Sequence, residues 1–248
     1  MAKEAMIYGI HPVMEALEAG KEIDKVLIQM GLRVEHFREL IHMLDSREIP
    51  YQTVPIQKLN RVTGKNHQGI IAFISPVEYM DIEKLLPIIF EDGQNPFLLI
   101  LDRVTDVRNF GALARTAECA GVHAIIIPSR GAAQINEDAI KTSSGALMSI
   151  PVCRSANLKN TLRFLRDSGL QIIAATEKAK SDYYDVDLTV PTALIMGSEE
   201  DGISEAYLKM CDSLVRIPLL GEVMSLNVSV AGGVLMYEVV KQRLTQAD

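Results

Sequence analysis

Five polar side chains in the second half of the chain are of types that could do chemistry together. Amides and hydroxyls orient a polar substrate, a carboxylate can accept a proton, and a guanidinium binds phosphate through two parallel hydrogen bonds. The candidates are Asn109, Arg115, Glu199, Ser225 and Asn227. Arg115 lies in an otherwise apolar helical stretch, so it indicates a charged partner such as phosphate.

Three of these candidates also have a structural interpretation. Asn109 could cap a helix that begins near it, as Ser204 could cap a later one. Arg115 could be an ordinary surface residue. Glu199 could be one of several solvated acids in a loop, although it lies closest to the end of the apolar run before it.

The last predicted helix, at 227–244, follows a segment of hydroxyls and amides. Its small residues at 231–234 indicate close packing, either in the core or against a second subunit. A plain core helix has less need of the polar segment, so we expect Ser225 and Asn227 to face a ligand.

The candidates need a scaffold that brings separate segments together, and the second half of the chain predicts one. Near-continuous apolar runs alternate with helical periodicity, which is typical of a parallel sheet covered on both faces. Ligands collect at the carboxyl ends of such strands. The predicted strands are 97–101, 124–128, 171–175, 192–196 and 213–217, and the helices are 110–120, 137–143, 157–168, 204–211 and 227–244.

The first part of the chain predicts a smaller α/β domain. A helix starts at His11-Pro12 and ends at Gly20, and a second is expected over 34–47. Strands are expected over 25–29 and 69–74. Before the second strand lies a polar, positively charged loop that contains Lys65, Asn66, His67 and Gln68.

Composition excludes several classes of protein. The chain has 248 residues, 48% of them hydrophobic, which is enough for a folded core. Its net charge of −7 argues against a protein that coats nucleic acid, so any RNA contact would be local. No apolar run reaches the about 18 residues of a membrane helix, and no secretory leader is visible, so we expect a soluble, cytoplasmic protein.

Neither the cysteines nor the histidines form a recognisable ligand pattern. The three cysteines, Cys119, Cys153 and Cys211, are far apart and lack C-x-x-C spacing, so we expect small buried hydrophobes. The histidines show no ligand spacing, and no metal site is expected.

Charge and composition change between residues 78 and 96. Acidic side chains outnumber basic ones there, and Pro87, Gly93 and Pro96 interrupt the segment. We predict a first domain at 1–77, a linker with a short amphipathic helix at 78–96, and a second domain at 97–248.

Three segments of the second domain resemble the motifs of the SpoU branch of the SPOUT RNA methyltransferases. They are NFGALARTA at 109–117, IMGSEEDGIS at 195–204 and IPLLGEVMSLNVSVAGGVLMYE at 217–238. In that family a methyl group passes from S-adenosylmethionine to ribose 2′-hydroxyls of RNA. The segments GIHPVMEAL and KNHQGI of the first domain are similar to the substrate-binding domain of enzymes that methylate a guanosine of 23S rRNA.

The resemblance implies a fold, a cofactor and partners. The fold would be α/β, with a small N-terminal RNA-binding domain and a C-terminal parallel-sheet domain tied in a trefoil knot. S-adenosylmethionine would bind near Gly197, Ile217 and Leu226, and a homodimer would complete the active site. Structured RNA, most simply ribosomal RNA, would contact Lys65, Asn66, His67 and Gln68, with ordering of the loop as the alternative for His67.

The resemblance also implies roles at the active site. The family's arginine at the position of Arg115 is assigned to activating the hydroxyl. Because a guanidinium stays protonated, we predict that Arg115 instead holds the RNA phosphate and stabilises the forming alkoxide. A phosphate oxygen or Glu199 would accept the proton. Asn109, Ser225 and Asn227 would position the ribose and the helix ends.

The sequence departs from the family's pattern at one position, and it leaves alternative functions open. Glu200 stands where many relatives have glycine, which adds an acidic group beside the expected site. The same reaction on transfer RNA or on another ribosomal site is an alternative, and so is a non-catalytic RNA-binding assembly factor. The third motif favours an enzyme, and the N-terminal domain favours ribosomal RNA.

Overall fold

The structure is a computed structural model that describes residues 5–246 of the chain. These residues form two compact units: residues 5–78 and 135–137 make up the first, and residues 79–134 and 138–246 the second. The expected fold class is confirmed, since the first unit is a small α/β unit and the second is built on a parallel sheet.

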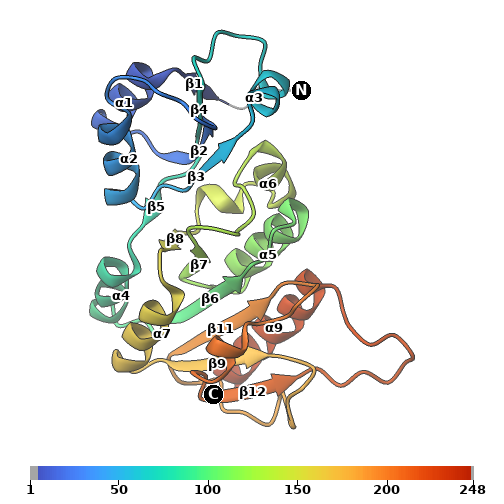
Figure 1. The fold of residues 1–248 in the computed structure, drawn as a ribbon. Helices are drawn as coiled ribbons and strands as arrows, with labels where there is room; N and C mark the ends of the chain where they lie inside the picture. The colour runs from blue at the N-terminus through green and yellow to red at the C-terminus, as the bar shows by residue number, and fades with distance from the viewer. Residues whose placement is uncertain (1–4, 247–248) are drawn as a thin grey trace. The chain divides into compact units, whose positions relative to one another are not determined.

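The first unit is a mixed sheet with helices on both faces. Its elements are β1 (Met6–Tyr8), α1 (Ile10–Glu18), β2 (Ile23–Gln29), α2 (Phe37–Ser46), β3 (Tyr51–Val54), α3 (Ile56–Val62) and β4 (Ile70–Ile74). Within the described residues the strand order is β1-β4-β2-β3 (Figure 1). Val26 and Ile28 of β2 join the core under α1 and α2, whereas Leu27 faces Leu59 of α3. This alternation is the period of two that a strand imposes.

The second unit is built on a larger sheet whose paired strands all run parallel. The strands are β5 (Tyr79–Met80), β6 (Phe97–Asp102), β7 (Ala124–Pro128), β8 (Val152–Ser155), β9 (Gln171–Ala175), β10 (Ser181–Asp182), β11 (Thr192–Gly197) and β12 (Ser213–Arg216). Their order, within residues 5–246, is β10-β12-β9-β11-β6-β7-β8-β5. β6 and β11 are therefore neighbours in the middle of the sheet.

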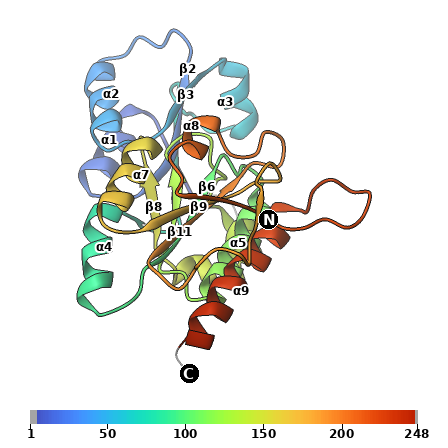
Figure 2. The same cartoon turned by 90° about the horizontal axis from the view of Figure 1, so that it is seen from below.

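Helices cover both faces of this sheet. They are α4 (Ile82–Glu91), α5 (Val107–Cys119), α6 (Glu137–Thr142), the 3-10 turn η1 (Ala146–Met148), α7 (Leu158–Asp167), α8 (Glu205–Leu208) and α9 (Val228–Gln246). Leu98 and Ile100 of β6 share a core with Leu86 of α4 and Leu162 of α7. On the other face α5 and α9 pack side by side (Figure 2). Burial on both faces explains why these strands are almost uniformly apolar.

Arg243 fastens the C-terminal part of α9 beside the sheet. Its guanidinium donates hydrogen bonds of 2.8–3.3 Å to the backbone carbonyls of Asn95, Pro96, Leu188 and Val190. Desolvation by burial lowers the pKa of Arg243. These bonds fix the direction of the helix that carries the third motif at its other end.

Most predicted elements exist, with three kinds of difference. The predicted strands 124–128 and 171–175 match β7 and β9 residue for residue. The short strands β1, β3, β5, β8 and β10 were not predicted, because two to four residues carry too little pattern. The predicted helix over 204–211 is only the short α8. The segment 78–96 is not a free linker, because Ile82, Leu86 and Ile89 of α4 are buried in the core of the second unit.

Candidate active site

Three side chains from three separate segments meet beyond the carboxyl ends of β6 and β11. Asn109 Nδ2 donates a hydrogen bond to Glu199 Oε1 at 2.9 Å, and Asn227 Nδ2 donates to the same oxygen at 2.7 Å. Asn227 Nδ2 also lies 2.9 Å from Asn109 Oδ1, which closes a triangle. We call these three residues the amide–carboxylate cluster. Among the described residues, Glu199 Oε2 has no hydrogen-bond partner.

Asn109 can join the cluster because another residue caps its helix. α5 begins at Val107, and Asp106 Oδ1 accepts the backbone N–H of Asn109 at 2.7 Å. An aspartate is favoured at this position by both hydrogen bonding and the helix dipole. The alternative interpretation, in which Asn109 caps the helix, is therefore wrong, and its side chain is left for the site.

Asn227 does two things in this arrangement. Its Oδ1 accepts hydrogen bonds from the Ser229 backbone N–H at 3.0 Å and from the Ser229 hydroxyl at 2.6 Å. The first of these is the contact of a helix N-cap, here at the start of α9. The amide nitrogen of the same side chain reaches the cluster, so one residue ties the helix start to the site.

Glu199 lies in a tight loop, residues 198–204, that joins β11 to α8. The Gly202 N–H donates to the Ser198 carbonyl at 3.0 Å, which closes the loop on itself. Gly197, at its entrance, has no room for a side chain, since an added Cβ would lie 2.2 Å from the carbonyl carbon of Gly202. Glycine at this position is thus a requirement of close backbone approach.

The far end of this loop is anchored by a residue that the sequence did not single out. Ser204 precedes α8 as predicted, but its side chain makes no cap bond. Instead its backbone N–H donates to Asp102 Oδ2 at 2.8 Å. Asp102 is buried at the last position of β6. The signal available in the sequence was an acid that directly ends an apolar run.

The other two predicted active-site residues lie apart from the cluster. Arg115 is on α5, about 9 Å further along the helix axis than Asn109 at 1.5 Å per residue. Its side chain is exposed and has no hydrogen bond or ion pair with the described residues, and the same is true of Ser225. Both are open to a ligand or to another subunit.

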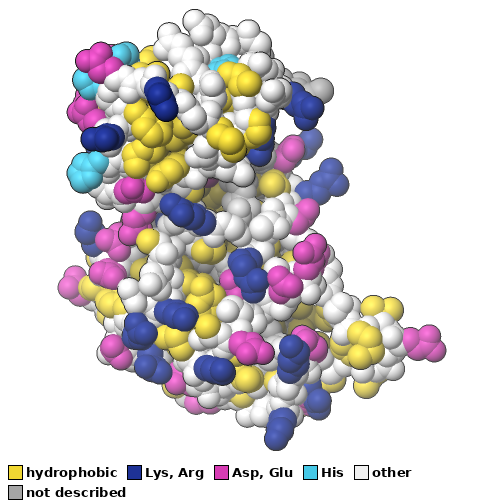
Figure 3. All heavy atoms as spheres, in the orientation of Figure 1, with side chains coloured by type: hydrophobic (Ala, Val, Ile, Leu, Met, Phe, Trp, Pro, Cys, Tyr) yellow, Lys and Arg dark blue, Asp and Glu magenta, His cyan; other side chains and the backbone are white. Residues whose placement is uncertain are grey.

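The residues expected to hold the cofactor are Gly197, Ile217 and Leu226. The last two lie near the ends of one exposed segment. The segment 217–227, which we call the open loop, projects away from the rest of the second unit (Figures 1 and 3). Leu220 is 99% exposed and Met224 is 79% exposed. No backbone hydrogen bond joins residues 218–226 to the rest of the described chain. Apolar side chains with free backbone donors and acceptors suit the flat faces and polar edge of an adenine, so the residues present fit S-adenosylmethionine.

The polar loop of the first unit divides the predicted RNA-binding residues into two kinds. Lys65, Asn66 and Gln68 are exposed. His67 is only 7% exposed: the Gly69 N–H donates to its Nδ1 at 3.0 Å, and its Nε2 lies 2.9 Å from Asn60 Oδ1. His67 therefore orders the loop, which is the alternative stated for it, and its ring is not displayed to RNA.

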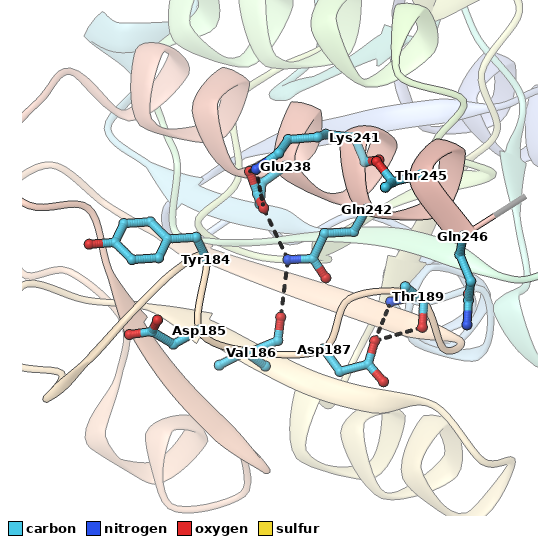
Figure 4. A pocket seen from close by; sticks show the side chains of 10 residues that line it. All are labelled: Tyr184, Asp185, Val186, Asp187, Thr189, Glu238, Lys241, Gln242, Thr245 and Gln246. Carbon is cyan, nitrogen blue, oxygen red and sulfur yellow. Dashed lines mark hydrogen bonds and ion pairs between the residues drawn. The ribbon is translucent and has the colours of Figure 1, made fainter. Parts of the chain in front are cut away.

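A hollow lies near the other end of α9, between that helix and the segment 184–189. Its volume is about 540 Å³. Gln242 crosses it and donates to the Val186 carbonyl at 3.2 Å (Figure 4). Its Oε1 accepts from the Leu188 N–H at 2.9 Å. The charged side chains that line it are Asp185, Asp187, Glu238 and Lys241. This acidic hollow does not suit an RNA phosphate, and it is separate from the cluster.

Of three further functional features, a cluster of metal ligands, a membrane-spanning helix and free thiols, residues 5–246 contain only the thiols. No group of three or more His, Cys, Asp or Glu side chains in that range is placed to hold a metal ion. No helix of that range is both long and apolar enough to cross a bilayer. Cys119 is exposed near the end of α5, so the expectation of three buried thiols is wrong. Burial raises the pKa of the Cys153 and Cys211 thiols to about 12.

Comparison with known proteins places this chain in a family. Residues 96–237 match the model of the SpoU rRNA Methylase family, and residues 6–80 match that of RNA 2′-O ribose methyltransferase substrate binding. A Staphylococcus saprophyticus protein named as a TrmH family tRNA/rRNA methyltransferase is 36% identical over 97% of both chains.

Two solved structures extend the comparison. The AdoMet-bound rRNA methyltransferase of Sinorhizobium meliloti has a TM-score of 0.61 at 25% identity, over 95% of this chain and 86% of that one. The A. aeolicus TrmH/SpoU tRNA modifying enzyme has a TM-score of 0.58 at 30% identity, over 67% of this chain and 86% of that one.

The parallel-sheet unit and the separate unit that matches a substrate-binding model define an RNA methyltransferase of SPOUT architecture. More particularly, the chain belongs to the SpoU methylase family. It is an RNA 2′-O ribose methyltransferase that uses S-adenosylmethionine.

Proposed function

We propose that this enzyme methylates the ribose 2′-hydroxyl of a guanosine in 23S ribosomal RNA. The neighbour named as an rRNA methyltransferase aligns with 95% of the chain, whereas the one named as a tRNA modifying enzyme aligns with 67%. The first unit, which matches the substrate-binding model, supports a large folded RNA as substrate. A cytoplasmic location and a role in rRNA processing follow from such a substrate.

The observation that carries the proposed chemistry is the one-sided bonding of Glu199. Both cluster amides donate to Oε1, which holds that end of the carboxylate, while Oε2 has no hydrogen-bond partner among the described residues. A ribose hydroxyl that donates to Oε2 would have its proton acceptor already in place. General base catalysis of this kind contributes about 10²–10⁴ in rate. A phosphate oxygen of the RNA is the alternative acceptor.

The remaining residues bind and orient. Arg115 holds an RNA phosphate and stabilises negative charge on the hydroxyl oxygen, while Ser225 contacts the ribose. Gly197, Ile217 and Leu226 border the cofactor, with the open loop folded against it in the trefoil knot that the family resemblance implies. S-adenosylmethionine supplies the electrophilic methyl group when bound. Lys65, Asn66 and Gln68 contribute local RNA contacts in a chain that is acidic overall.

We further infer a homodimer that uses the outer face of α9. The small residues at 231–234 could pack in the core or against a second subunit, and at least Gly232 packs within the chain, against Leu113 of α5. The exposed apolar residues Val230, Tyr237 and Leu244 remain, at 54%, 51% and 66% exposure. They are spaced every seven residues, about two turns, and so share one face. A second copy packed on this face would bring its own Arg115 or Ser225 toward the cluster.

The test is methylation of defined RNAs by the full chain. Tritiated S-adenosylmethionine is supplied with unmodified 23S rRNA in one reaction and unmodified tRNA in another. We expect label in 23S rRNA, in a dinucleotide that resists alkaline hydrolysis because its ribose lacks a free 2′-hydroxyl. Label in tRNA alone would overturn the substrate, and label on a base would overturn the chemistry.

A further inference from the structure

Arg103, the residue after β6, has a backbone conformation that arginine rarely adopts. Its φ is +58°, in the left-handed region where glycine is comfortable and a Cβ is crowded. Because this conformation is unfavourable for arginine, we expect interactions of the Arg103 side chain to stabilise it.

The Arg103 guanidinium binds four acceptors at once. Nε and Nη2 donate to the two carboxylate oxygens of Asp102 at 3.0 and 3.2 Å, Nη1 donates to Asp201 Oδ2 at 3.1 Å, and Nη2 donates to the Gly202 carbonyl at 3.2 Å. Neighbouring side chains of a strand point to opposite faces. The turn at Arg103 is what lets its side chain lie beside that of Asp102.

Asp102 is the fixed point of this arrangement. It is 2% exposed, and its Oδ2 also accepts the Ser204 N–H at 2.8 Å. A buried carboxylate is stable only when it is paired and hydrogen-bonded. The hydrogen bond to Asp102 raises the pKa of Arg103. Together Asp102 and Arg103 hold residues 201, 202 and 204, the second half of the Glu199 loop.

The first half of the loop is tied to the second. Ser198 Oγ accepts the Asp201 N–H at 3.1 Å, and the Ser198 carbonyl accepts the Gly202 N–H at 3.0 Å. Glu199 lies between these tied positions and reaches the cluster amides on the other side. Motion of the second half would therefore move the Glu199 carboxylate.

We propose that Arg103 is a positioning residue for methyl transfer, which fastens the 198–204 loop to the end of β6 and so keeps Glu199 against Asn109 and Asn227. The proposal rests on the proposed role of the cluster. No hydrogen bond joins Arg103 to any cluster residue, so its effect passes through the loop.

The test compares Arg103→Gly with Arg103→Lys in the full chain. The glycine variant removes the guanidinium and also relieves the steric crowding of the positive φ. If Arg103 had only a local structural role, the variant would keep its activity. We expect kcat for methyl transfer to fall roughly 10- to 100-fold at saturating S-adenosylmethionine and RNA, as small misplacements of reacting groups do. KM for RNA should stay within about twofold, and lysine, which keeps the charge without the planar fork, should restore part of kcat.

Glu48→Gly is the matched control. Glu48 is exposed, lies in the first unit and has the same left-handed conformation, with φ +56°. Relief of backbone crowding there should leave kcat at the wild-type value. A kcat of Arg103→Gly within twofold of wild type would overturn the proposal.

Amide hydrogen exchange separates this proposal from the proposed function. We expect faster exchange confined to residues 198–204 in Arg103→Gly, whether or not a given RNA is a substrate. Exchange equal to wild type would overturn the proposal even if the enzyme methylates 23S rRNA as expected. Should Arg103→Gly not fold, Asp201→Ala cuts one contact to the loop and leaves the Asp102 pair intact. It should raise exchange in 198–204 and lower kcat several-fold, and wild-type values of both would overturn the proposal.

Discussion

The side-chain amide of Asn227 donates to Asn109 Oδ1 at 2.9 Å across 118 positions of sequence. Both amides also donate to one oxygen of Glu199, so three distant segments share a single set of hydrogen bonds. Each amide has a fixed donor and a fixed acceptor side. The orientation of the carboxylate is consequently set before any substrate arrives, as electrostatic preorganisation requires.

Glu199→Gln tests the proton acceptor. Glutamine keeps an oxygen for the two cluster amides but cannot take a proton, so we expect the single-turnover methylation rate to fall about 10²–10⁴-fold. Binding of S-adenosylmethionine, measured by calorimetry, should change little. Glu200→Gln, one residue along the same loop, serves as the control. A near-normal rate in Glu199→Gln would assign the proton to a phosphate oxygen.

Arg115→Ala tests the phosphate clamp. Loss of a charge that stabilises the forming alkoxide should lower the methylation rate about 10²–10³-fold while cofactor affinity is kept. Arg115→Lys should recover part of the rate. Arg166→Ala, which removes an exposed arginine from α7, should have no effect. A defect of Arg115→Ala that lies wholly in cofactor binding would remove this role.

Tyr237→Asp tests the dimer. A carboxylate in the middle of the exposed apolar face of α9 would be desolvated on association, so we expect a monomer in sedimentation and little methylation. Ile88→Asp, at an exposed apolar position of α4, should not change the mass. An active wild-type monomer would contradict the shared site.

Gly197→Ala tests the close approach at the entrance of the Glu199 loop. The added Cβ would meet backbone atoms of Gly202 and Ile203 at 2.2–2.5 Å, which cannot move without shifting the loop. We expect a loss of about 1–3 kcal/mol in the free energy of unfolding, the usual range for overpacking. Gly221→Ala, where a Cβ meets nothing within 4 Å, should unfold at the wild-type denaturant concentration. Equal stability of the two variants would show that the Glu199 loop can shift to admit the added Cβ without a loss of stability.

The fold was largely predictable because its strands are buried on both faces. Uninterrupted runs such as 124–128 end where burial ends, so their limits could be read from residue types. Edge strands such as β3 are partly exposed and mix polar with apolar residues, which removes the signal. The short amphipathic helix predicted within 78–96 exists as α4, but the acidic residues there favoured a linker, whereas Leu86 and its neighbours join the core.

At the site, residue types could be predicted but their bonds could not. Asn109, Glu199 and Asn227 were each chosen for their chemistry, yet only the fold decides that Asp106 caps α5 and leaves the Asn109 amide free. Arg103 gave no signal, because the role proposed for it depends on a positive φ, which its residue type does not predict. For His67 the residue types left RNA contact and ordering of the loop both open, and only the burial of the ring beside Asn60 decides between them.

The two hydrogen-bonding sides of Asn227 also limit how this position can drift during evolution. Serine, threonine, aspartate and asparagine are nearly interchangeable at the start of most helices. Here serine and threonine would lack the amide that reaches Glu199, and aspartate would set a second negative charge beside its carboxylate. Substitutions that are neutral at other helix starts would be removed by selection at this one. The position must supply both an acceptor for the helix N-terminus and an amide donor for Glu199, and among these four residues only asparagine supplies both.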